Sequence, residues 1–93
     1  MQRYYLHLKF LTQMVVDPDG SEHPNVDDAI QEAKAAIRDI AAQSIRIRNP
    51  LALSSIRICD ANGNQLSEVF ASETLSELLL PAFLDLAASA RRS

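Results

Sequence analysis

Acidic and amide side chains gather in two short segments of this sequence. The segment Asp17–Glu22 is rich in acids, and Asp60, Asn62 and Asn64 have the spacing that begins an EF-hand calcium loop. That pattern is not completed, because Gly63 falls at the fourth position instead of the sixth and no acid stands at the twelfth. Asp, Asn, Pro and Gly are also the residues that form tight turns. We therefore expect turns here and no metal site.

The two histidines and the single cysteine offer little catalytic chemistry. His7 and His23 lie on different predicted elements, and neither has a marked carboxylate partner of the kind that an acid–base catalyst needs. Cys59 has only Arg57 close in sequence to favour a reactive thiolate. The sequence also lacks a Gly-x-Ser-x-Gly elbow and a glycine-rich phosphate loop. We expect no enzyme activity and no cofactor.

Length and composition indicate one small ordered domain. The chain has 93 residues, of which 47% are hydrophobic and only two are glycine. The net charge of -3 argues against an overall attraction to nucleic acid. A lone cysteine excludes an internal disulfide, and the chain shows neither a signal-peptide pattern nor an apolar run long enough to span a membrane. These features favour a cytoplasmic protein.

The clearest structural signal is an amphipathic helix over Asn25–Ile47. Asn25 is a good N-cap residue, Asp27 and Asp28 suit the positive end of the helix dipole, and Asn49-Pro50 ends the pattern. Apolar or small residues recur at alternating spacings of four and three. They are Val26, Ile30, Ala33, Ile37, Ile40, Ser44 and Ile47.

Alternation predicts strands on both sides of this helix. The segment 3–10 alternates cleanly, the segment 13–16 follows it through a turn at Leu11-Thr12, and the segments 55–59 and 65–71 are joined by a hairpin at Asn62-Gly63. The capping-box pattern Thr74–Glu77 then predicts the start of a second helix. That helix either kinks at Pro81 or breaks there into two pieces.

Several of these segments resemble a known family. They are the opening Met1–Leu8, the turn Asp17–Glu22 with Pro24, then Ala29, Glu32 and Ala33, the strand Ile56–Ile58, the turn Asp60–Gly63, and Phe70. The chain resembles small bacterial proteins of unknown function, mostly from rhizobia, that open with Met-x-Arg-Tyr-aromatic-x-His-Leu. The resemblance covers residues 1–71, and it implies a fold but no activity.

The order of elements predicts a single α+β domain of the form β-β-α-β-β-α. We expect a four-stranded, mainly antiparallel sheet in the order 2-1-3-4, with the long helix on one face. The alternative places the third strand parallel to the second. Residues 1–71 would form the β-β-α-β-β body, and residues 72–93 a C-terminal helical segment that completes the domain or dimerises. The expected core is Tyr4, Leu6, Leu8, Phe10, Val15, Val26, Ile30, Ala33, Ile37, Ile40, Ile56, Ile58, Leu66 and Phe70.

In the favoured order, basic and aromatic side chains share the sheet face away from the long helix. Aromatic rings can stack on bases while cations hold the phosphate backbone, so this face is a candidate nucleic-acid surface. A plain solvated face is the simpler interpretation, because the face has a single tyrosine and the protein is acidic. The residues are Arg3, Tyr5, His7, Lys9 and Arg57.

The C-terminal segment carries more apolar residues than the buried stripe of a surface helix needs. A small domain can hardly cover them all, so we expect a non-enzymatic interaction module that forms a homodimer through this segment. The alternatives are packing within one chain, which would complete a small core, and association with a different protein partner. The expected interaction residues are Leu75, Leu78, Leu79, Ala82, Phe83 and Leu86.

Overall fold

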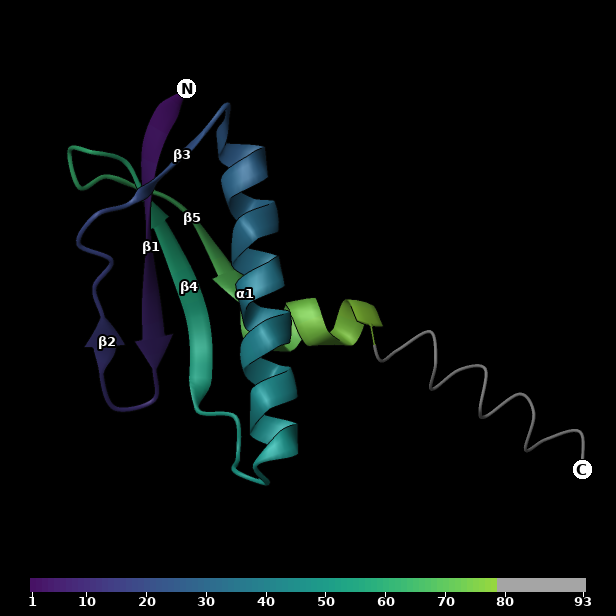
Figure 1. The fold of residues 1–93 in the computed structure, drawn as a ribbon. Coiled ribbons are helices and arrows are strands. Elements are labelled where there is room, and N and C mark those ends of the chain that lie inside the picture. Colours follow the sequence, from purple (N-terminus) through teal and green to yellow (C-terminus); the bar gives the residue numbers. More distant parts are fainter. Residues whose placement is uncertain (79–93) are drawn as a thin grey trace, which may run out of the picture.

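The computed structural model describes residues 1–78. It has an antiparallel sheet with a long helix on one side, and a short helix at residues 71–78 follows the last strand directly (Figure 1). The predicted α+β class is confirmed. The labelled elements are β1 (Gln2–Phe10), β2 (Met14–Val15), β3 (Ser21–His23), α1 (Val26–Arg46), β4 (Leu53–Cys59) and β5 (Gln65–Phe70).

The sheet has five strands instead of the four that were expected. The path runs β2-β1-β4-β5, and β3 pairs with β1 beside β2, on the same edge. The strand at β3 was missed because Ser21-Glu22-His23 contains no apolar residue to reveal it. β4 pairs antiparallel with β1, so the parallel alternative is wrong. The hairpin at Leu11-Thr12 forms, and its turn is closed by the Phe10 N–H, which donates to the Gln13 carbonyl at 2.8 Å.

Helix α1 begins and ends with local capping contacts. The Asn25 side chain accepts a hydrogen bond from the Asp28 N–H at 2.9 Å, as the predicted N-cap requires. At the other end Arg48 takes a positive φ of 59°, and the N–H groups of Arg48 and Asn49 donate to the carbonyls of Ile45 and Ser44. This is a Schellman ending in which an arginine occupies the position usually held by glycine.

The core lies between α1 and the central strands of the sheet. Ile37, Ile56 and Ile58 are fully buried there, each contributing roughly 1.5–3 kcal/mol by the usual value for a buried aliphatic side chain. The apolar stripe of α1 is centred on Ala29, Ala33, Ile37 and Ala41. The partly buried residues packed against this core include Leu6, Leu8, Phe10, Val26, Ile30 and Ile40.

Three expected core residues are exposed instead. Val15 is 46% exposed because α1 packs against the other four described strands but does not reach β2. Leu66 and Phe70 are 47% and 41% exposed, whereas Val69 is buried. The pairing between β4 and β5 shifts at Leu66, but residues 67–70 pair regularly and place Val69 opposite the core residue Ile56. Val69, and not Phe70, therefore faces the core.

The short helix starts earlier than the capping-box pattern indicated. It begins at Ala71, so Thr74 lies inside it and is buried instead of capping its first turn. Leu75 packs against the core, and the Lys34 ammonium of α1 lies 3.2 Å from the Glu77 carboxylate. Neither α1 nor the described part of this helix has the length and apolar character needed to cross a membrane.

Candidate functional site

The sheet face opposite α1, which we call the outer face, carries the predicted basic and aromatic residues. Alternation along β1 puts Arg3, Tyr5, His7 and Lys9 on the side away from the core residues. The antiparallel register then places His7 directly opposite Arg57 of β4. The structure therefore brings all five predicted residues to one face, although it does not leave all of them free to bind a ligand.

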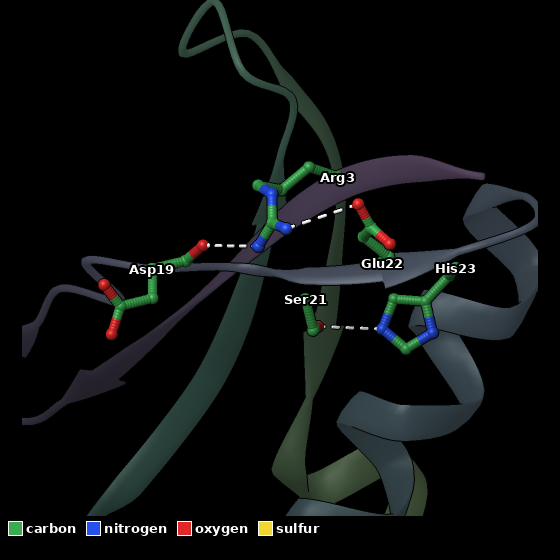
Figure 2. A network of polar contacts seen from close by, with 5 residues as sticks. All are labelled: Arg3, Asp19, Ser21, Glu22 and His23. Carbon is green, nitrogen blue, oxygen red and sulfur yellow. Dashed lines mark hydrogen bonds and ion pairs between the residues drawn. The ribbon is translucent and has the colours of Figure 1, made fainter.

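Arg3 is held in a polar network at one end of this face. Its guanidinium donates to the Asp19 carbonyl at 2.8 Å and to the Glu22 carboxylate at 3.3 Å (Figure 2). Close to these contacts, but not joined to them, the Ser21 hydroxyl and His23 Nε2 lie 2.9 Å apart (Figure 2). Arg3 thus ties β1 to β3 and to the turn before it, which gives it a structural role.

Glu68 of β5 lies opposite Arg57 of β4 and offsets the positive charge of the outer face. Its carboxylate accepts a hydrogen bond from the buried Ser55 hydroxyl and lies 3.6 Å from Arg57 Nε. The Ser55 hydrogen bond, followed by the nearby charges of Arg57 and Lys9, holds the pKa of Glu68 below its ordinary value. Because Leu66 and Phe70, two residues to either side of Glu68, were expected in the core, this neutralising partner was not foreseen on the outer face.

Tyr5 and His7 supply two rings to the outer face. Their centroids are 6.4 Å apart and their planes are inclined by 23°, so the rings are stacked. His7 Nδ1 accepts a hydrogen bond from the Asp17 N–H at 3.0 Å. Since a backbone N–H can only donate, Nδ1 carries no proton and the neutral ring carries its proton on Nε2. The outer face therefore presents a two-ring platform with a defined histidine tautomer.

Asp17 joins three segments at the point where β1 changes partner from β2 to β3. Its carboxylate accepts the Leu6 N–H at 3.2 Å and the Gly20 N–H at 3.1 Å. Neither β2 nor β3 pairs with Leu6, so Asp17 supplies the acceptor that a longer strand would have provided. Gly20 has a φ of +69°, and a Cβ there would lie 2.8 Å from the Tyr4 carbonyl oxygen. The acidic turn therefore has a structural role, because it connects β2 and β3 and holds both beside β1.

The second acidic turn is also explained by its own hydrogen bonds. The Asp60 carboxylate accepts the N–H groups of Asn62 and Asn64, each at 2.9 Å. The bond from Asn64 is the main cause that keeps the pKa of Asp60 below its ordinary value. Among residues 1–78 no three metal-ligating side chains converge. Cys59, next to this turn, is buried and so lacks the exposure of a reactive thiol.

An apolar cleft with a volume of about 400 Å³ lies between α1 and the β1–β2 edge. It forms where α1 leaves β2 uncovered, and Val15 and Val16, which are 46% and 62% exposed, belong to its lining. This volume lies within the range of ligand pockets, roughly 300–1,000 Å³. Sequence reasoning missed the cleft because it assigned Val15 to the core. The remaining lining residues are Leu6, Leu8, Asp17, Pro18, Ser21, Glu32, Ala36 and Ile56.

The predicted interaction residues of the C-terminal segment are only partly within the described chain. Leu75 is half-buried against the core, whereas Leu78, one turn further, is 53% exposed. The short helix therefore begins by packing on its own domain and then turns an apolar side chain to the surface. Leu79, Ala82, Phe83 and Leu86 lie outside the described residues.

Comparison with known proteins identifies a family but no activity. No curated protein and no solved structure matches the chain. The model of a family described as a domain of unknown function, DUF6894, matches residues 3–72. This range includes α1 and all five labelled strands, except for the first residue of β1. The sequence predicted membership of a family of unknown function, and the chain belongs to such a family, DUF6894.

Proposed function

We propose that this protein is a small non-enzymatic interaction module that forms a homodimer through its C-terminal apolar segment. The observation that carries the proposal is the change along the short helix from Leu75, packed on the core, to Leu78, 53% exposed. The sequence continues from Leu78 with more apolar residues, of which Leu79 and Phe83 are the largest near its start. An exposed apolar side chain followed by an apolar sequence favours burial against a partner.

The symmetry of a homodimer makes a second copy the simplest partner. Closed two-fold dimers are the commonest oligomers of soluble proteins, and they need no second gene product. Uncharged residues dominate the segment that follows Leu78, whereas interaction with a charged partner would call for a charged surface.

The test is multi-angle light scattering on the full chain and on a doubly substituted variant. We expect the unaltered chain to dimerise and Leu79→Glu with Phe83→Glu to run as a folded monomer, because buried glutamates without partners are costly at an interface. The matched control is Leu66→Glu, which replaces an exposed leucine of β5 outside the segment and should leave the dimer intact. A monomeric unaltered chain at high micromolar concentration would refute the proposal.

Nucleic-acid binding by the outer face is the second candidate, favoured by one observation. The stacked rings of Tyr5 and His7 supply two aromatic surfaces, as single-strand-binding platforms usually do. Against it stand the Glu22 and Glu68 carboxylates, which pair with Arg3 and Arg57. Fluorescence anisotropy with mixed single-stranded RNA and DNA at low salt tests this candidate. Absence of binding at tens of micromolar protein, or binding unaffected by Tyr5→Ala with Arg57→Ala, would reject it.

A further inference from the structure

We propose that the apolar cleft between α1 and the β1–β2 edge receives residues 79–93 of a second copy of the chain. This inference rests on the proposed homodimer and names the surface that its C-terminal segment would contact. Exchange of the two segments would create two equivalent interfaces, as two-fold symmetry requires.

The cleft has the chemistry of a receptor for an apolar segment. Its floor includes the fully buried Ile56, and its open side includes Val15 and Val16, which are 46% and 62% exposed. Its rim carries two acidic residues, Asp17 and Glu32, and no basic residue belongs to the described lining. An occupant with apolar side chains and a cationic end would therefore match the cleft in both polarity and charge.

Residues 79–93 have that composition. The segment begins with apolar residues that include Leu79, Leu80, Phe83 and Leu84, and it ends with Arg91-Arg92 before the final serine. Its single acid is Asp85, so the cationic groups are concentrated at one end. The arginines could approach Asp17 and Glu32 while the leucines and the phenylalanine enter the apolar part of the cleft.

The cleft is preformed because β2 is fixed from both sides. The Phe10–Gln13 hydrogen bond closes the hairpin before β2, and Asp17 fixes the chain just after Val16 through bonds to Leu6 and Gly20. A segment that enters the cleft therefore does not have to order the strand first, which lowers the entropic cost of binding.

The direction in which the chain leaves the domain favours a second copy over the same copy. The ion pair of Lys34 with Glu77 places the short helix on one side of α1. The cleft lies on the other side, because it is lined by Glu32 and Ala36. Each of these is two residues from Lys34 and so roughly 200° away around the helix. β5 and β2 also stand at opposite ends of the sheet path, roughly 14 Å apart at the usual strand spacing.

The direct path from Leu78 to the cleft of the same copy crosses the solvent-exposed surface of α1. That surface carries exposed polar residues, including Gln31, Arg38 and Asp39, which would make poor contacts with leucine and phenylalanine side chains. A second copy can present the segment from outside and avoids this crossing.

Cysteine cross-linking in the full chain tests the inference. In a Cys59→Ala background, Ala36→Cys is combined with Phe83→Cys, and the matched control combines Phe83→Cys with Arg38→Cys on the exposed side of α1. Mild oxidation of an equal mixture of ¹⁴N- and ¹⁵N-labelled protein is followed by peptide mapping, which separates links between copies from links within one copy. We expect mixed-isotope 36–83 links, at least tenfold more abundant than the 38–83 links of the control.

The outcomes separate this inference from the proposed dimer. Links of 36 to 83 within one copy, or equal linking by the control, would overturn docking by a second copy. A dimer seen by light scattering without any 36–83 link would overturn the cleft as the receptor and leave the dimer standing. A monomer without such a link would overturn both.

Discussion

Replacing Asp17 with alanine should destabilise the fold more than replacing its neighbour Asp19. The Asp17 carboxylate accepts two backbone N–H groups, from Leu6 at 3.2 Å and from Gly20 at 3.1 Å. Asp19 lies in the same turn, but it contributes its backbone carbonyl to Arg3, and alanine keeps that carbonyl. Each substitution therefore removes one acidic side chain, but the two substitutions differ in the hydrogen bonds that are lost.

The expected cost follows from the exposure of these groups. A hydrogen bond to a charged group contributes about 1.5–3 kcal/mol, and a buried N–H left without a partner costs about 1–3 kcal/mol. Since Asp17 and Leu6 are both half-buried and water can replace part of the loss, we expect about 2 kcal/mol for Asp17→Ala. For a domain of this size that corresponds to a fall in Tm of about 8–16 °C. Asp19→Ala should cost less than about 0.5 kcal/mol, as an exposed surface substitution does.

Urea denaturation followed by circular dichroism measures both costs. All variants should be compared at one protein concentration, because dimerisation would shift the apparent stability. Asp17→Asn is a useful third variant, since its amide keeps one acceptor oxygen and should lose about half as much as Asp17→Ala. Equal stability of the Asp17→Ala and Asp19→Ala proteins would show that the connection between β2 and β3 does not depend on the Asp17 carboxylate.

Two further predictions concern the turn glycines and the acid sensitivity of the sheet. Gly20→Ala should cost more than Gly63→Ala, because both glycines have positive φ but only the Cβ at position 20 would meet backbone, 2.8 Å from the Tyr4 carbonyl oxygen. Chemical denaturation would contradict this if the two free energies of unfolding fell equally. The Ser55 hydrogen bond lowers the pKa of Glu68 in the folded state. The ionised Glu68 therefore stabilises the fold above the ordinary glutamate pKa of about 4.3, and this contribution is lost as the pH falls below that value. Carboxylates titrate between about pH 3 and pH 5, so Glu68→Gln should reduce the loss of stability over that range. An unchanged dependence of stability on pH would show that Glu68 does not contribute.

Strong local patterns made much of the fold predictable. The alternation of β1, the capping signal at Asn25 and the apolar Ile56 and Ile58 of β4 are each set by local sequence, and all three are confirmed: β1 forms, Asn25 caps α1, and the two isoleucines are fully buried. β3 has no apolar side chain, so its pairing with β1 is set by the Asp17 turn and by Arg3 instead of by burial. No periodic pattern can show such a strand.

The errors at Val15 and Phe70 have different causes. Val15 is apolar and in phase with Leu8, yet it is exposed because the width of α1, and not the pattern of β2, decides how much of the sheet is covered. Phe70 is exposed because β5 pairs with β4 so that Val69, and not Phe70, lies opposite the core residue Ile56. Both outcomes depend on how elements pair and pack, which single-sequence patterns do not contain.

The candidate sites were predictable to a similar degree. Alternation was sufficient to place Tyr5, His7 and Lys9 on one face, but it gave no sign that Glu22 and Glu68 would pair with the arginines of that face. The cleft depends on the gap between α1 and β2, so it became visible only in the structure.

Sedimentation equilibrium of the full chain and of two exposed apolar-to-acid variants is the decisive measurement. We expect the unaltered protein to approach twice the chain mass of 10.3 kDa at high micromolar concentration. Val16→Asp, in the cleft, should weaken the dimer at least tenfold, whereas Leu11→Asp, at the 79% exposed tip of the neighbouring hairpin, should leave the dissociation constant unchanged. A monomer at every concentration, or equal weakening by the two substitutions, would contradict dimerisation through this cleft.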